Sequence, residues 1–342
     1  MSNRVSRFQF FLIFFLLGLL VSCSLDIEAE LPTRQTVIQK EAQVESLLPF
    51  STSALAQVDR PGETPSPPRP VSAQIKQSGM PTPMMCRKNP GQMELHSLQT
   101  DKLPLPLEFR VWLPPCYDEL AADRFPVLYL IHGQSFTDDQ WDRLGADEMA
   151  ASMIASGEAP PFIIVMPRDR SWAQPTEDRF GEVVIEELIP WIDTQYRSLP
   201  DREYRSVGGL SRGGGWAVHF ALSHPDLFSS LGAHSVAIFW ADTPKIKKWL
   251  GEIPEELPLR IYLDIGDHDR MEIRRSAMWF ENLLTGRGIS HEWHLFSGFH
   301  DEEYWGNHVD EYLRWFVEGW DLPSLSVDGS IELSNSARHG ED

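Results

Sequence analysis

Apolar runs and helical periodicity alternate along the central part of the chain. Continuous apolar runs, typical of strands covered on both faces, occupy residues 125–131 and 162–167. Further strand patterns lie at residues 204–208, 231–236, 259–265 and 291–296, and an early antiparallel pair is predicted at 91–98 and 107–113. Helical periodicity occurs at 183–196, 214–222, 271–284 and 304–320. Strands joined by crossover helices predict an α/β fold in three layers, with a doubly wound, mostly parallel sheet flanked by helices.

The N-terminal segment has the pattern of an export signal. Arg4 and Arg7 precede an apolar run over residues 8–21. The run has about fourteen residues whereas a membrane-spanning helix needs roughly twenty, so we predict a signal peptide over residues 1–22. The run ends at Leu20-Val21-Ser22-Cys23, which resembles the bacterial lipobox. The resemblance implies a lipid on Cys23 that anchors an exported protein to the cell envelope, and an ordinary signal peptide is the alternative.

The composition changes after the apolar run and again near the C-terminus. All 12 tryptophans lie between Trp112 and Trp320, and prolines cluster between Pro61 and Pro83. A segment with so few large apolar side chains does not bury enough surface to offset its ordering entropy. We therefore predict a disordered, Pro-rich tether over 23–85, a folded domain over 86–322 and a flexible tail over 323–342.

Charge and cysteine content exclude two classes of protein. The 342 residues include 50 acidic and 30 basic side chains, giving a net charge of −20, which argues against a nucleic-acid partner. Three cysteines are too few for a small disulfide-stabilised scaffold. In an exported protein, Cys86 and Cys116 are expected to form a disulfide, with two reduced, buried thiols as the alternative.

One motif in the centre of the chain carries chemistry. Gly209-Leu210-Ser211-Arg212-Gly213 fits the pattern G-x-S-x-G, and it lies between a predicted strand and a predicted helix. This is the setting of a nucleophile elbow, a tight turn that exposes a serine beside a helix N-terminus.

The residues needed to activate such a serine follow in the chain. Gly266-Asp267-His268-Asp269 comes after the fifth strand of the central run, and Gly298-Phe299-His300 comes after the sixth. Both lie at carboxyl ends of parallel strands, where open α/β sheets place their sites. The order serine, acid, histidine is that of α/β-hydrolases.

The region from Gly91 to Trp315 resembles the esterase family of α/β-hydrolases that includes S-formylglutathione hydrolases, feruloyl esterases, enterochelin esterase and mycolyltransferases. The motifs that carry the resemblance are Leu113-Pro114-Pro115-Cys116-Tyr117, residues 126–133, Gly209–Gly214, and Gly298-Phe299-His300-Asp301 with Tyr304-Trp305. Arg212 departs from the family pattern, which often has Met or Leu after the serine.

The resemblance implies a role for each site residue. Ser211 is the expected nucleophile, His300 the general base and then acid, and Asp269 the residue that orients His300, with Asp267 as the competing acid. Backbone N–H groups of Gln134 and Arg212 are the expected oxyanion donors.

The remaining candidates receive narrower predictions. We expect Trp172 and Trp305 to line a substrate cleft. His132 is expected to brace the oxyanion loop, and we interpret His219, His224 and His234 as structural. The acidic run Asp301-Glu302-Glu303 is interpreted as the start of a helix, so we predict no metal site, and no cofactor is expected.

These features together predict a serine carboxylic-ester hydrolase that works through an acyl-enzyme. Its partner would be a small-molecule or polysaccharide-linked ester, whose acyl and alcohol groups the sequence does not identify. The alternatives are an acyltransferase with the same triad, and a non-catalytic lipoprotein that binds a glycan or envelope component.

Overall fold

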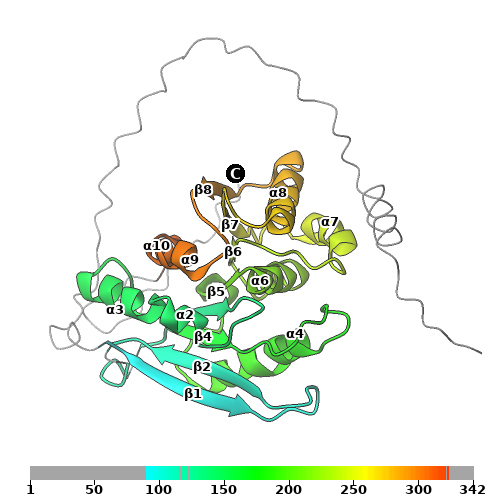
Figure 1. Ribbon diagram of the computed structural model, residues 1–342. Helices are drawn as coiled ribbons and strands as arrows, with labels where there is room; N and C mark the ends of the chain where they lie inside the picture. The colour runs from blue at the N-terminus through cyan, green and yellow to red at the C-terminus, as the bar shows by residue number, and fades with distance from the viewer. Residues whose placement is uncertain (1–89, 116, 122, 321, 323–342) are drawn as a thin grey trace, which may run out of the picture. The chain divides into compact units, whose positions relative to one another are not determined.

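One eight-stranded sheet runs through the part of the protein that the structure describes (Figure 1). The computed structural model describes residues 90–322, apart from residues 116, 122 and 321. The strands lie in the order β1-β2-β4-β3-β5-β6-β7-β8. Their bounds are β1 Gln92–Leu98, β2 Leu107–Leu113, β3 Val127–Ile131, β4 Ile163–Pro167, β5 Arg205–Leu210, β6 Ser230–His234, β7 Arg260–Gly266 and β8 Glu292–Phe296.

The strand directions confirm the predicted mostly parallel sheet with an antiparallel edge. β1 pairs antiparallel with β2, in a register that places Gln92 opposite Leu113, and β2 pairs antiparallel with β4. The pairings from β4 through β3, β5, β6 and β7 to β8 are all parallel. Six consecutive strands therefore end at the same edge of the sheet, where the loops that follow them meet.

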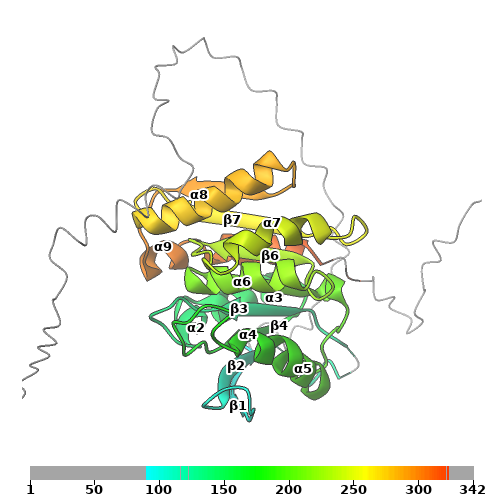
Figure 2. The ribbon, with the colours of Figure 1, turned by 90° about the vertical axis from the view of Figure 1, so that its right-hand side faces the viewer.

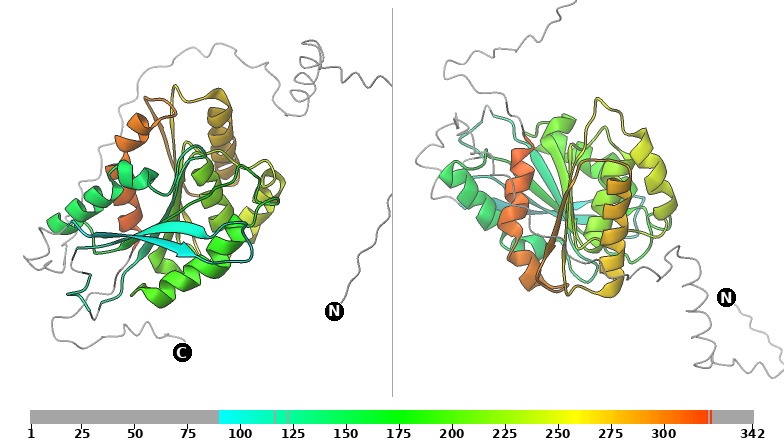
Figure 3. Two further views of the ribbon diagram at one scale, coloured as in Figure 1. Left: turned by 60° about the horizontal axis from the view of Figure 1, so that its bottom comes forward. Right: turned by 90° about the horizontal axis from the view of Figure 1, so that it is seen from above.

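Helices cover both faces of the sheet and complete the three layers. Their bounds are α2 Gln140–Arg143, α3 Ala146–Ser156, α4 Phe180–Val183, α5 Ile189–Gln195, α6 Arg212–Ser223, α7 Thr243–Glu252, α8 Met271–Gly286, α9 Glu302–Gly306 and α10 Val309–Glu318. Buried side chains of α4 through α8 share one hydrophobic core, and those of α2, α3, α9 and α10 share a second. Figure 2 shows α6, α7 and α8 in front of the sheet, and the right-hand view of Figure 3 shows the layers from above.

The two continuous apolar runs form the central strands β3 and β4, as predicted. Every residue of β3 and β4 is buried, because each strand has helices on both faces. Burying an aliphatic or aromatic side chain of this kind stabilises the fold by about 1.5–3 kcal/mol. The sheet is therefore a rigid support for the loops at its carboxyl edge.

The helices differ from the predicted ones in identifiable ways. The periodic stretch 183–196 forms α4, a π-helical segment at Val184–Leu188, and α5. Pro190 lacks the N–H that would continue an α-helical ladder, which accounts for the change of register there. The stretch 304–320 is divided between α9 and α10, and α3 and α7 were not predicted.

Several predictions concern residues outside those that the structure describes. They are the signal peptide over 1–22, the lipid on Cys23, the tether over 23–85, the pairing of Cys86 with Cys116, and the tail over 323–342. Within the described part of the chain, no helix combines the length and the apolar character that crossing a bilayer requires.

Candidate active site

Ser211 occupies a strained turn between β5 and α6. Its φ of 54° and ψ of −113° lie in a region of backbone conformation that residues other than glycine rarely adopt. The turn is held from both sides, because the Ser211 N–H donates to His234 O (2.8 Å) and the Ala237 N–H donates to Ser211 O (3.0 Å). The strain is therefore balanced by neighbouring backbone, and the side chain of Ser211 faces the carboxyl edge of the sheet.

Two glycines of the motif are required by close backbone approach. A Cβ at Gly209 would lie 2.2 Å from the carbonyl carbon of Gly213, and a Cβ at Gly213 would lie 2.1 Å from Ile131 O. No side chain fits at such distances, so the elbow needs glycine at both positions. The spacing G-x-S-x-G is thus a steric requirement of this turn.

His300 contacts both Ser211 and Asp269. His300 Nε2 lies 2.9 Å from Ser211 Oγ, and His300 Nδ1 lies 2.9 Å and 3.0 Å from the two carboxylate oxygens of Asp269. Since a carboxylate only accepts hydrogen bonds, this network assigns the proton to Nδ1 and leaves Nε2 to accept from the serine hydroxyl. The Asp269 side chain is fully buried and that of His300 is 9% exposed, so water screens this arrangement little.

Asp267, the competing acid, lies apart from His300. Its carboxylate accepts from the Gly298 N–H (3.0 Å) and pairs with His268 Nδ1 (2.6 Å). The hydrogen bond from Gly298 is the main reason that the pKa of Asp267 lies below its usual range. Asp267 therefore holds the loop that carries His300, and Asp269 is the carboxylate in contact with the imidazole.

The loop after β3 carries Gln134 and is braced by His132. His132 Nε2 accepts from the Asp169 N–H (3.0 Å), and His132 Nδ1 lies 2.7 Å from Gly133 O. Gly133 N–H donates to Gln140 Oε1 (2.8 Å). Burial lowers the pKa of His132, so its neutral ring donates from Nδ1 and accepts at Nε2. The loop is fixed beside the N-terminus of α6, where Arg212 begins the helix.

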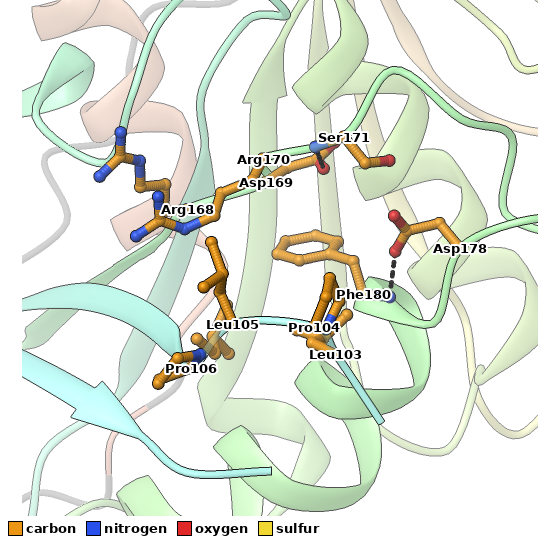
Figure 4. A pocket seen from close by; sticks show the side chains of 11 residues that line it. Leu103, Pro104, Leu105, Pro106, Arg168, Asp169, Arg170, Ser171, Asp178 and Phe180 are labelled. Atoms are coloured by element: carbon orange, nitrogen blue, oxygen red, sulfur yellow. Dashed lines mark hydrogen bonds between the residues drawn. The ribbon is translucent and has the colours of Figure 1, made fainter. Parts of the chain in front are cut away.

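Two hollows flank the segment that follows β4. One, of about 380 Å³, is lined by Gln134–Thr137 on one side and by Arg168–Arg170 and Trp172 on the other; we call it the Trp172 hollow. The other, of about 220 Å³, lies between Leu103–Leu107 and the same segment (Figure 4). Trp172 is 70% exposed, and its role in binding a substrate stays a prediction. Neither hollow is lined by Ser211 or His300, and both are lined by Asp169, whose side chain contacts Arg212 directly after the serine.

The prediction that Trp305 lines a cleft is wrong. Trp305 is only 1% exposed, its Nε1 donates to Ser235 Oγ (3.1 Å), and its ring meets that of His300 edge-on at 5.0 Å. Helix α9 begins directly after the His300 loop and turns this side chain inward. Trp305 supports the imidazole from behind and does not face solvent.

A buried polar cluster beneath the triad was not predicted from the sequence. Asp264, fully buried on β7, accepts from the hydroxyls of Tyr304 (2.6 Å) and Tyr312 (2.8 Å) and lies 2.6 Å from His234 Nδ1. Burial, together with the Asp264 charge, raises the pKa of both tyrosines, so they remain donors. The interpretation of His234 as structural agrees with this position. The available signal in the sequence was an aspartate directly between the apolar residues Leu263 and Ile265.

The side chain of Arg212 also takes part in a contact that the sequence did not predict. Its Nε donates to Asp169 Oδ2 (2.7 Å), and the Trp216 indole donates to the same oxygen (2.7 Å). His219 on α6 lies 2.7 Å from Asp242, and His224, directly after α6, lies 2.8 Å from Ser223, in agreement with their interpretation as structural. Asp301 caps α9 through the Tyr304 N–H (2.9 Å), as expected of a helix start.

The sheet order and the arrangement of Ser211, His300 and Asp269 at its carboxyl edge define an α/β-hydrolase. A family model described as "Putative esterase" matches residues 100–316. The chain belongs to this esterase family.

Two curated proteins illustrate the similarity. The chain is 29% identical over 203 residues to an endo-1,4-beta-xylanase/feruloyl esterase of Xylanibacter ruminicola, a match that covers 53% of this chain and 26% of the relative. It is 32% identical over 135 residues to an esterase of Mycobacterium tuberculosis, covering 36% of this chain and 28% of that protein. The chain thus spans about a quarter of the length of these curated relatives.

The solved structures agree with this assignment. A ferulic acid esterase superposes with a TM-score of 0.60 at 25% identity, covering 67% of this chain and 99% of its own. A ferulic acid esterase from Anaeromyces mucronatus, solved with ferulic acid, gives a TM-score of 0.56 at 20% identity, covering 66% and 90%. At that identity the second likeness supports the fold alone.

Proposed function

We propose that the protein is a serine esterase that cleaves carboxylic esters through an acyl-enzyme on Ser211. The observation that carries the proposal is the continuous hydrogen-bonded chain from Ser211 Oγ through His300 to Asp269. A hydroxyl is a weak nucleophile until a neighbouring base accepts its proton, and His300 Nε2 lies within hydrogen-bond distance to do so.

The two half-reactions use the same imidazole. In the first, Ser211 Oγ bonds to the ester carbonyl carbon while its proton passes to His300 Nε2. The carbonyl then re-forms as the C–O bond to the alcohol breaks, and the alcohol leaves with that proton. In the second, a water oxygen bonds to the acyl carbon, His300 takes the water proton, and that proton returns to Ser211 Oγ as the acid departs. The backbone N–H groups of Gln134 and Arg212 are the proposed donors to the oxyanion in both steps.

For the substrate, we propose an aromatic acyl ester of a sugar or polysaccharide. Two of the similar proteins are named as feruloyl or ferulic acid esterases. The exposed indole of Trp172 supports the same class, since a flat apolar surface next to the oxyanion loop suits an aromatic ring. Hydrolysis, and not transfer to another alcohol, is proposed because the relatives are named as esterases.

An ester panel with an activity-based probe tests this function. We expect methyl ferulate and feruloylated arabinose to be hydrolysed with kcat/KM at least about tenfold above acetylated xylose and S-formylglutathione, since shape-matched pockets discriminate by at least this much. A fluorophosphonate should form one adduct, on Ser211, detectable by mass spectrometry. Labelling without hydrolysis of any ester would favour an acyltransferase, and absence of both would favour a non-catalytic binding protein.

We also propose that the esterase is exported and tethered through a lipid on Cys23. The support comes from sequence alone: Arg4 and Arg7, the apolar run and the Leu20-Val21-Ser22-Cys23 motif. In a bacterial host, full-length protein is expected to incorporate radiolabelled palmitate and to sediment with membranes. Cys23→Ala should lose the label, and a label that persists in this variant would contradict lipidation at Cys23.

A further inference from the structure

Arg212, the residue that departs from the family pattern, is buried in an ion pair. The Arg212 Nε donates to Asp169 Oδ2 (2.7 Å) and its Nη2 donates to Ala173 O (2.7 Å). The side chains of Arg212 and Asp169 are 6% and 2% exposed. We call this pair the latch, because it joins the nucleophile elbow to the segment after β4.

Asp169 also connects the latch to the oxyanion loop. Its backbone N–H donates to His132 Nε2 (3.0 Å), and its Oδ1 accepts from the Ser171 N–H (2.9 Å). One residue thereby holds three parts of the site together: the elbow through Arg212, the Gln134 loop through His132, and its own segment through Ser171.

The segment held by the latch forms the walls of both hollows. Residues 168–179 form neither helix nor strand, so their backbone is positioned by these individual contacts. Arg168–Ser171 face Leu103–Pro106 on one side (Figure 4), and Trp172 borders Gln134 on the other. Arg212 meets this segment at Ala173, directly after Trp172. The position of the exposed indole therefore depends on the latch.

A buried ion pair is weak evidence for stability, because desolvating two charges offsets most of their attraction. An apolar residue after the serine would avoid that cost. The pair has a reason to be here if it fixes the position of residues 168–179 relative to the elbow more tightly than apolar packing would. The Trp216 indole N–H, which donates to Asp169, and the Ala173 carbonyl, which accepts from Arg212, supply that directionality.

We propose that the latch determines substrate specificity by holding Trp172 as the wall on which an aromatic acyl group stacks. The inference rests on the proposed esterase function and deepens it, since it assigns the choice between aromatic and small acyl groups to Arg212 and Asp169. Both act as positioning residues through their side chains. Displacing a binding group by about 1 Å is enough to cost on the order of 10²-fold in rate.

The test compares 4-nitrophenyl ferulate with 4-nitrophenyl acetate, which share a leaving group and differ in the acyl group. Asp169→Asn should lower kcat/KM for the ferulate about tenfold relative to the acetate, mainly through KM, as loss of aromatic contact does. Trp172→Ala should lower the same ratio to a similar extent. In the double variant Asp169→Asn/Trp172→Ala the ratio should fall no further, because both changes remove the same contact, that between the Trp172 indole and the aromatic acyl group.

Two further variants keep the test independent of folding. Asp193→Asn breaks a partly buried pair, Arg205–Asp193 (2.8 Å), which involves the first residue of β5 at the opposite end from Ser211. It should lower Tm and leave the ferulate-to-acetate ratio unchanged. Arg212→Met alone leaves the Asp169 carboxylate buried without its partner, whereas Arg212→Met/Asp169→Asn removes both charges of the latch. The double variant should therefore have a higher Tm than Arg212→Met, while its ferulate-to-acetate ratio stays low.

Equal losses for both esters in Asp169→Asn, or losses that add fully to those of Trp172→Ala, would overturn the latch. A wild-type ferulate-to-acetate ratio in Arg212→Met/Asp169→Asn would also overturn it. If the wild-type enzyme neither reacts with a fluorophosphonate nor hydrolyses either ester, the proposed function fails and this inference fails with it. Labelling and hydrolysis with an unchanged ratio would reject the latch alone.

Discussion

Ser211→Ala is expected to lower kcat for ester hydrolysis on the order of 10⁶-fold, because the acyl-enzyme no longer forms. The oxyanion donors and the binding surface remain, so a residual rate above the uncatalysed reaction should persist. The change removes one oxygen and leaves the backbone turn at φ 54° in place. The measurement is a progress curve with an aromatic ester at high enzyme concentration, together with fluorophosphonate labelling.

The control for this prediction is Ser223→Ala in α6, the helix that follows Ser211. Ser223 lies at the last turn of α6, where its hydroxyl donates to His219 O, far along the helix from the elbow. We expect this variant to retain the wild-type rate, and both variants to unfold within a few degrees of wild type. A Ser211→Ala protein that keeps more than a small fraction of its kcat, once purified free of host esterases, would contradict the assignment of the nucleophile.

The central strands of the sheet could be predicted because helices cover them on both faces. β3 and β4 are buried along their whole length, so their sequences are unbroken apolar runs. Helix α3 gives a weaker signal: three of its five buried residues are alanines, Ala146, Ala150 and Ala151. Alanine contributes little to a hydrophobic pattern, although it allows α3 to pack near the sheet. β6 ends at His234, earlier than predicted, because Ser235 has a φ of 46°.

The residues of the triad were recognisable because each follows a strand that the pattern had already located. Ser211 follows β5, Asp269 lies just beyond β7, and His300 lies just beyond β8. Parallel strands bring their carboxyl ends together, so positions separated by 31 and 89 residues in sequence become neighbours. The choice between Asp267 and Asp269 depended on loop geometry, which a spacing rule does not determine.

The contacts around the triad were not predictable in the same way. The latch joins Arg212 to a residue 43 positions earlier, in a segment without helix or strand. No periodicity relates such positions, and each charge alone looks like a solvated side chain. The orientation of Trp305 likewise depends on where α9 begins, which Asp301 fixes by capping the helix.

Asp269→Asn is expected to lower kcat about 10⁴-fold while KM changes little, because the histidine is left in the wrong tautomer. The reason lies in a second contact of this carboxylate. Asp269 Oδ1 accepts from the Arg270 N–H (2.6 Å), so an asparagine keeps its oxygen in that position and places its NH₂ group where Oδ2 lies 3.0 Å from His300 Nδ1. Nδ1 then accepts, the proton moves to Nε2, and Nε2 no longer accepts from Ser211 Oγ.

Asp267→Asn is the matched control, two residues away in the same loop. Asp267 Oδ1 accepts from the Gly298 N–H, and an asparagine oxygen replaces it in that role. We expect kcat to change by no more than about threefold, since partly exposed substitutions that keep their acceptor cost little. Steady-state kinetics of both variants on one ester decide the assignment. A loss in Asp267→Asn as large as in Asp269→Asn would mean that the acid is shared or exchanged during turnover, whereas a loss confined to Asp269→Asn identifies the carboxylate that orients His300.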